Sequence, residues 1–212
     1  MLLDFAKLQL ELCESEDEKI HDAAAMATIQ ISATAIEAVI LDMWHRIVEP
    51  PLKGPDGSPV GEYVLPTSLV ELLVTWMPLS SKTTRIEDRL SALYRHVFRS
   101  SMPKGQEPFQ LWQDLMKLRN SIVHYRPFAA VADNRSQTFE AEVSVPRSLV
   151  NRFPFLSPKS GSNEEPPPWP SSALVPEIAS WACETAEAMF VRLEEDEEIW
   201  AQNGYCDPSF YK

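Results

Sequence analysis

The chain has 212 residues, a formal net charge of −12 and 44% hydrophobic residues. That length suits one domain, or one domain with appendages, and the apolar content is sufficient for a sizeable core. Since there is no uninterrupted apolar run of the roughly 18 residues that cross a membrane, and no secretory pattern at the start, we expect a soluble, cytoplasmic protein without a membrane partner. The three cysteines, Cys13, Cys183 and Cys206, lack metal-binding spacing, which predicts free thiols rather than disulfides or a zinc site.

Charge is distributed unevenly along the chain. Between Lys82 and Arg135 there are ten basic and five acidic residues, whereas the remainder holds nine basic and 26 acidic residues. Phosphate binding relies on clustered Lys and Arg, so a nucleic-acid partner is expected to bind only the basic segment. The two acidic runs, residues 14–22 and 194–198, are expected to be solvated helix ends rather than an interaction tail.

In chain order, the first predicted element is a long helix over residues 15–48, which opens with acidic residues that suit a helix N-terminus. Its apolar positions alternate small and large side chains, which suits packing against other helices. Residues 50–65 are predicted to form a loop insertion rich in Gly and Pro. A short helix is expected over residues 68–76. A further helix, capped by the hydroxyls of residues 80–84, carries apolar residues at helical spacing: Ile86, Leu90, Leu93, Tyr94 and Val97.

The second half of the chain contains two further predicted helices, over residues 107–125 and 176–200. Between them, residues 126–172 are predicted as a loop-rich, proline-rich insertion, in which residues 138–145 form either a short strand or an irregular loop. The expected core residues of the last helix are Ile178, Trp181, Ala182, Ala188, Met189 and Leu193. The pattern therefore predicts one all-α domain over residues 1–212, a bundle of about four to five main helices. Without a Gly-rich phosphate loop or strand–helix alternation, Rossmann and P-loop enzymes are not expected.

The helix over residues 107–125 has two distinct sides when about 100° is allowed per residue, with Pro108 in its first turn. Its apolar side is formed by Leu111, Trp112, Leu115, Leu118, Ile122 and Val123. The opposite side is a polar stripe of Gln113, Lys117, Asn120 and His124. Because Pro127 disfavours helical geometry at Arg126, His124 falls in the last turn, where the helix C-terminus raises the pKa of an imidazole. That is useful for proton transfer near neutrality.

Arg119 lies within the apolar arc of this helix, at roughly 140° from His124. Two interpretations follow. In the first, Arg119 closes a buried ion pair with a carboxylate of the first or last helix, the candidates being Glu37, Asp42, Glu184 and Glu187. In the second, its guanidinium reaches a groove beside the helix and holds a phosphate. Spacing alone favours the ion pair.

Arg119, four further residues and then His124, with the polar Asn120 directly after the Arg, resemble the R-x4-6-H signature of the HEPN superfamily. The flanking residues, from Pro108 to Pro127, look like the motif helix of small stand-alone HEPN-like proteins. This resemblance implies a helical bundle that forms a homodimer through the motif helix. In active members it implies a metal-independent endoribonuclease of defence or stress responses, which uses no cofactor.

The resemblance also implies roles for particular residues. His124 would act on the proton of the ribose 2′-hydroxyl as it attacks the adjacent phosphate, Arg119 would stabilise the developing charge, and Asn120 would orient the His or the phosphate. Cleavage would leave a 2′,3′-cyclic phosphate. The separation of Arg119 from His124 on one helix favours a composite site built from two antiparallel motif helices. The predicted substrate-binding residues are Gln113, Lys117, Tyr125 and Arg126.

A second hypothesis is a catalytically inactive HEPN-like module that uses the same polar stripe for dimerisation, or for binding a nucleotide or a protein. The strongly acidic remainder of the chain would repel RNA away from the basic segment. Some HEPN toxins carry a Tyr two residues after the His, whereas here that position is Arg126 and Tyr125 comes one residue earlier. Regulation by AMP transfer to that Tyr is therefore not expected. The sequence identifies neither the RNA target nor an antitoxin-like partner.

Overall fold

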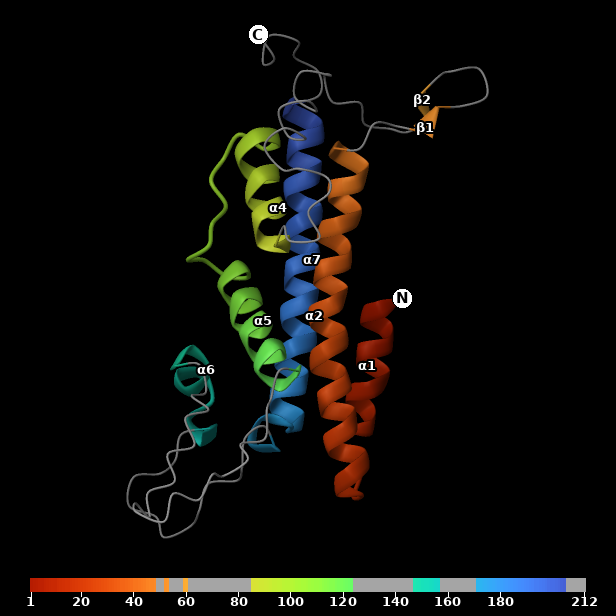
Figure 1. Ribbon diagram of the computed structural model, residues 1–212, viewed down its shortest axis with the longest axis vertical. Helices are drawn as coiled ribbons and strands as arrows, with labels where there is room; N and C mark the ends of the chain where they lie inside the picture. The colour runs from red at the N-terminus through yellow and green to blue at the C-terminus, as the bar shows by residue number, and fades with distance from the viewer. Residues whose placement is uncertain (49–51, 54–58, 61–84, 124–146, 157–170, 205–212) are drawn as a thin grey trace, which may run out of the picture. The chain divides into compact units, whose positions relative to one another are not determined.

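The computed structural model describes residues 1–48, 52–53, 59–60, 85–123, 147–156 and 171–204, and this part of the chain is all-α with about five main helices (Figure 1). The main helices are α1 (Leu2–Leu12), α2 (Glu18–Val48), α4 (Ile86–Ala92), α5 (Phe109–Val123) and α7 (Pro176–Gly204). The shorter elements are a π-helical segment η1 (Leu93–Val97), α6 (Arg147–Arg152), and the 3-10 turns η2 (Pro154–Leu156) and η3 (Ser171–Ala173). Among the described residues, extended pairing is limited to an antiparallel two-residue ladder of β1 (Leu52–Lys53) and β2 (Pro59–Val60).

The chain divides into two compact units. Unit 1 comprises residues 1–33 and 110–186, and unit 2 comprises residues 34–109 and 187–212. The boundary falls within both long helices, so α2 and α7 each supply their first half to unit 1 and their second half to unit 2. Each unit is described by itself below.

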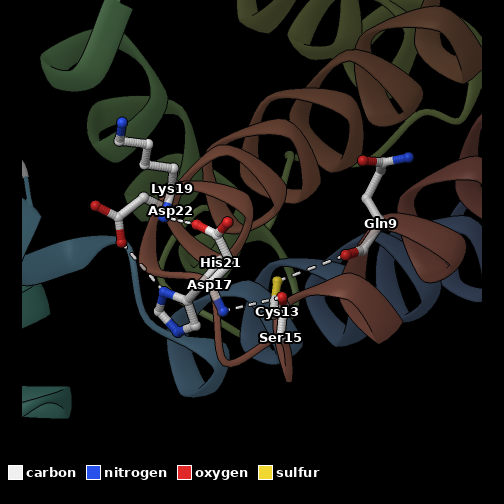
Figure 2. Close-up of polar contacts among 7 residues, drawn as sticks. All are labelled: Gln9, Cys13, Ser15, Asp17, Lys19, His21 and Asp22. Carbon is white, nitrogen blue, oxygen red and sulfur yellow. Dashed lines mark hydrogen bonds and ion pairs between the residues drawn. The ribbon is translucent and has the colours of Figure 1, made fainter.

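In unit 1, the turn that joins α1 to α2 is fixed by side-chain caps (Figure 2). The backbone N–H of Lys19 donates to Asp17 Oδ1 over 3.0 Å, so Asp17 caps the first turn of α2. The N–H of Asp17 in turn donates to Ser15 Oγ over 3.2 Å. The acidic run at residues 14–22 thus includes a helix cap, because an exposed carboxylate satisfies a backbone donor that the helix leaves unpaired.

The core of unit 1 encloses a small group of hydroxyls and thiols. Thr28 and Ser32, one turn apart on α2, are fully buried, and Thr28 Oγ1 donates back to the carbonyl of Ala24 over 2.9 Å. Ser32 Oγ lies 3.6 Å from Cys183 Sγ on α7. Cys13, at the end of α1, is 1% exposed, and burial raises the pKa of its thiol. Both thiols are packed in the core, and neither forms a disulfide among the described residues, in agreement with the cysteine spacing.

Unit 2 is organised around aromatic side chains and buried acids. The ring of Tyr94 meets those of Phe98 and Phe109 edge-on, at centroid distances of 5.1 and 5.5 Å. The Tyr94 hydroxyl donates to Asp196 on α7, which also accepts from Arg192 Nε over 3.0 Å. Burial, and then the hydrogen bond to the Asp196 carboxylate and its charge, raise the pKa of the Tyr94 phenol far above its usual range.

Most predicted elements are confirmed, with differences at their ends. The helix predicted over residues 15–48 is α2, and α7 matches the last predicted helix. The structure adds α1, which the sequence pattern did not predict. Arg85 is the N-cap residue of α4, and its side chain makes no capping hydrogen bond. The hydroxyls of residues 80–84 were expected to cap this helix, and these residues lie outside the described part of the chain. The helix predicted to begin near residue 107 begins at Phe109, directly after Pro108. The helix predicted over residues 68–76 lies outside the described residues.

Two residues expected in the core are exposed. Val123, at the end of α5, is 51% exposed, and Ala188 on α7 is also exposed. Val123 lies at the edge of the apolar arc and Ala188 buries little area, so neither position requires a covering element. The possible strand at residues 138–145, and most of the insertion at residues 126–172, lie outside the described residues.

One helix is long and apolar enough to cross a membrane, judged by length and composition alone: residues 18–46 of α2. Half of its most apolar 18-residue stretch is buried inside the protein. The expectation of no membrane span rested on uninterrupted apolar runs, whereas α2 is apolar on average although Thr, Ser and Gln interrupt it. A core helix of a soluble protein passes the same test, so a single helix of this kind is weak evidence for a membrane protein.

Candidate functional site

The described part of α5 has the two sides that its sequence predicts. Trp112, Leu115, Leu118 and Ile122 are buried, and Phe109 at its start is buried too. On the opposite side, Gln113 is half-buried and Lys117 and Asn120 are exposed. The helix therefore presents its polar stripe to solvent over at least two turns, because the apolar stripe is fully used by the core.

Arg119 sits between these two sides. Its side chain is half-buried, and its Nη1 donates to Oδ1 of Asn120 over 2.9 Å. One nitrogen of the guanidinium is therefore bonded to the polar stripe. Two of the four carboxylates proposed as its buried partners have contacts of their own: Asp42 pairs with Arg46 over 3.0 Å, and Glu184 accepts from Ser180 Oγ over 3.0 Å.

The pair formed by Arg119 and Asn120 can hold an anionic oxygen. A guanidinium offers five N–H donors in a planar fork, which matches the geometry of phosphate. The bond to Asn120 fixes one edge of that fork and directs the amide group of Asn120 beside it. Two neighbouring polar groups at the end of α5 can thus bind a phosphate together.

His124, Tyr125 and Arg126 follow Val123 and lie outside the described residues. The predicted outward orientation of His124, its raised pKa, and the predicted contacts of Tyr125 and Arg126 with substrate therefore stay predictions. Asn120 is exposed, and a helical continuation of α5 would place a residue four positions further on the same side.

A buried carboxylate on α5 was not anticipated from the sequence. Asp114 is 6% exposed, and its Oδ1 accepts from Lys117 Nζ over 2.9 Å and from Ser148 Oγ of α6 over 2.8 Å. The i,i+3 spacing of Asp114 and Lys117 could have indicated the first contact. The second joins segments 34 residues apart, and nothing local indicates it. Lys117, a predicted substrate-binding residue, is thus held at the side of Asp114.

In unit 2, one described basic residue of this segment pairs with an acid and another lies against an aromatic ring. Lys104 Nζ pairs with Glu87 over 2.8 Å, and the guanidinium of Arg89 lies 5.8 Å from the ring centre of Trp44. Arg95 and Arg99 are exposed on either side of His96. Burial, and then the charges of these two Arg residues, lower the pKa of His96, so this imidazole stays neutral to lower pH than usual.

Within the described residues, no group of three or more His, Cys, Asp or Glu side chains could hold a metal ion. Comparisons of the chain with known protein families, with curated proteins and with solved structures found no significant match.

Proposed function

We propose that this protein is a HEPN-like, metal-independent endoribonuclease that uses the ribose 2′-hydroxyl of its substrate as the nucleophile and acts in defence or stress. His124 removes the 2′-hydroxyl proton, and the attacking oxygen displaces the 5′-oxygen of the next nucleotide. The departing 5′-oxygen takes up a proton from water, and His124 then returns its proton to the solvent. The products are a 2′,3′-cyclic phosphate and a 5′-hydroxyl. Arg119 stabilises the charge that develops on the phosphoryl oxygens, as a preorganised cation does.

The observation that carries this proposal is the contact between Arg119 and Asn120. Through its Nη1, the guanidinium is bonded to an exposed side chain of the polar stripe, beside which a phosphate can approach. Arg119 precedes His124 by five residues, which is about one and a half turns of an α-helix. The position of Lys117 on the same stripe supplies a further cation for the RNA backbone.

The test is cleavage of a mixed RNA pool in the presence of EDTA. Wild-type protein is expected to cut RNA, and both His124→Ala and Arg119→Ala should lower the rate by roughly 10²- to 10³-fold. Arg119→Lys keeps the charge but not the planar fork, so it should restore only part of the rate. Arg95→Ala removes an exposed Arg elsewhere in the basic segment and serves as the matched control, for which a near wild-type rate is expected.

The chemical ends of the fragments identify the mechanism. A 2′,3′-cyclic phosphate that is absent with His124→Ala supports the proposal, whereas a 3′-hydroxyl with a 5′-phosphate contradicts it. Wild-type protein that is no more active than His124→Ala would favour the second hypothesis, an inactive module that uses this stripe for dimerisation or ligand binding. In that case His124→Ala should alter oligomer mass or ligand affinity and leave RNA intact.

A further inference from the structure

Four polar side chains follow one another around α5, all of them within unit 1. At about 100° per residue they come at steps of about 60°, 60° and 100°, in the order Asp114, Lys117, Asn120 and Arg119. Because Asn120 Oδ1 accepts from Arg119 Nη1 over 2.9 Å, the amide nitrogen of Asn120 remains as a donor. The cations of Lys117 and Arg119 thus lie on either side of this amide. We refer to Lys117, Asn120 and Arg119 as the donor row.

Lys117 is held in the donor row by a buried acid behind it. Its Nζ lies 2.9 Å from Asp114 Oδ1, and this oxygen also accepts from Ser148 Oγ of α6 over 2.8 Å. Asp114 is 6% exposed, whereas the side chain of Lys117 is 57% exposed. An ammonium has three donors, of which the bond to Asp114 uses one. A long, flexible side chain is therefore fixed beside Asn120 before a ligand arrives, which lowers the entropy cost of binding.

The charges of α5 favour an anion at the donor row. Asp114 is the one acid in the sequence of α5, against the two bases Lys117 and Arg119. Since Asp114 is buried, an approaching anion meets the exposed ammonium directly and the carboxylate only behind it, and Coulomb interactions weaken with distance. The net charge of −12 opposes contact with a polyanion elsewhere on the chain, so the contact with the donor row is expected to be short.

We propose that Lys117 binds the phosphate next to the one held by Arg119 and Asn120, so that the donor row selects a nucleotide chain with two successive phosphates. Two cations on either side of one amide suit two anionic groups joined by a short link, as successive phosphates are joined through one sugar. Asp114 and Ser148 are positioning residues, which hold Lys117 and do not touch the substrate. The inference rests on the proposed function for the class of ligand, a nucleotide chain, and concerns its binding, not its cleavage.

The test is the affinity of the full chain for two uncleavable probes, measured by fluorescence anisotropy. One probe is a 2′-deoxy dinucleotide with one phosphate and the other a 2′-deoxy trinucleotide with two, both labelled through an uncharged linker. Wild-type protein is expected to bind the trinucleotide roughly tenfold more tightly, as one additional charge-assisted contact allows. Lys117→Met should reduce this preference to less than about twofold, because the second phosphate loses its cation.

Lys104→Met is the matched control for Lys117→Met. The side chain of Lys104 is 52% exposed and pairs with Glu87 over 2.8 Å, so this variant removes a similar lysine from a similar ion pair in unit 2. It should keep the wild-type preference for the trinucleotide. Circular dichroism checks that each variant retains its helix content.

Salt dependence separates the residue that binds phosphate from the residues that position it. Lys117→Met should lower the slope of log affinity against log salt by roughly 0.7 for the trinucleotide, because a single strand loses one phosphate contact. Ser148→Ala should weaken trinucleotide binding by about threefold at an unchanged slope, since Lys117 is retained but held less firmly. Ser148→Thr keeps the hydroxyl and should restore the affinity.

Equal affinity of the wild type for both probes, or a preference that persists in Lys117→Met, would overturn the proposal. So would the absence of binding to either probe, or tighter binding of a hexaglutamate peptide than of the trinucleotide, which would identify an acidic protein as the partner. A preference for the trinucleotide in a protein that does not cut RNA would support this inference and contradict the proposed function. RNA cleavage without that preference would do the reverse.

Discussion

Arg46, near the end of α2, joins this helix to α7 within unit 2 through a two-point contact. Its Nη1 and Nη2 donate to the two carboxylate oxygens of Glu197 over 2.8 and 3.1 Å. Glu197 is 8% exposed, so most of its carboxylate is removed from water. The acidic run at residues 194–198, expected to be solvated, therefore includes one buried acid that needs this partner.

Arg46→Ala is expected to lower the free energy of unfolding by about 2 to 3 kcal/mol, because it leaves the buried Glu197 carboxylate without its cation. Arg46→Lys should recover only part of the loss, since an ammonium cannot donate to both oxygens in the same plane. Urea denaturation followed by circular dichroism measures the difference. Asp42→Ala is the control. Asp42, the other partner of Arg46, is 70% exposed, so its loss should lower the free energy of unfolding by at most about 1 kcal/mol, as for an exposed ion pair. Equal losses for Arg46→Ala and Asp42→Ala would contradict this assignment.

At the scale of elements, Ser148 of α6 donates a hydrogen bond to Asp114 of α5. The turn that follows α6 packs Phe153 against Trp181 of α7, with 5.6 Å between ring centres. Ser148→Ala should raise the rate of amide hydrogen exchange in residues 147–152, because it removes a bond to a charged acceptor worth about 1 to 2 kcal/mol. Lys117→Met tests the other bond to Asp114. Since Lys117 is 57% exposed, this change should leave exchange in α6 unaltered. Equal protection of α6 in wild type and Ser148→Ala would argue against the contact as its anchor.

What could be predicted from the sequence depends on how local the cause is. The buried and exposed sides of α5 follow from helical periodicity, as do the existence of α2 and α7. The contacts of Asp114 with Ser148 and of Arg46 with Glu197 could not be predicted, because each joins residues distant in the sequence. Helix α1 was missed because its apolar residues lie on two sides, which weakens the single stripe by which an amphipathic helix is identified.

The geometry of the candidate site could be predicted only in part. Periodicity placed Arg119 at the edge of the apolar arc, and its half-buried side chain agrees with that position. The direction of its guanidinium, toward Asn120, depends on a rotamer choice among several that the helix allows, and spacing cannot decide it. The interpretation as a phosphate-binding group therefore gains support from a contact that the sequence alone does not specify.

At the scale of the whole molecule, the proposed ribonuclease is expected to require two copies, because an ideal helix would separate Arg119 and His124 by about 140°. If Arg119 of one subunit works with His124 of the other, a mixed dimer of Arg119→Ala and His124→Ala retains one intact site. Random exchange of subunits makes half of the dimers mixed, each with one of two sites, so mixing two inactive proteins should restore roughly a quarter of the wild-type rate. Mixing Arg119→Ala with an Arg119→Ala, His124→Ala double variant should restore nothing. Recovery in the first mixture alone would establish a shared site, whereas no recovery, despite demonstrated exchange of labelled subunits, would place both residues in one subunit's site.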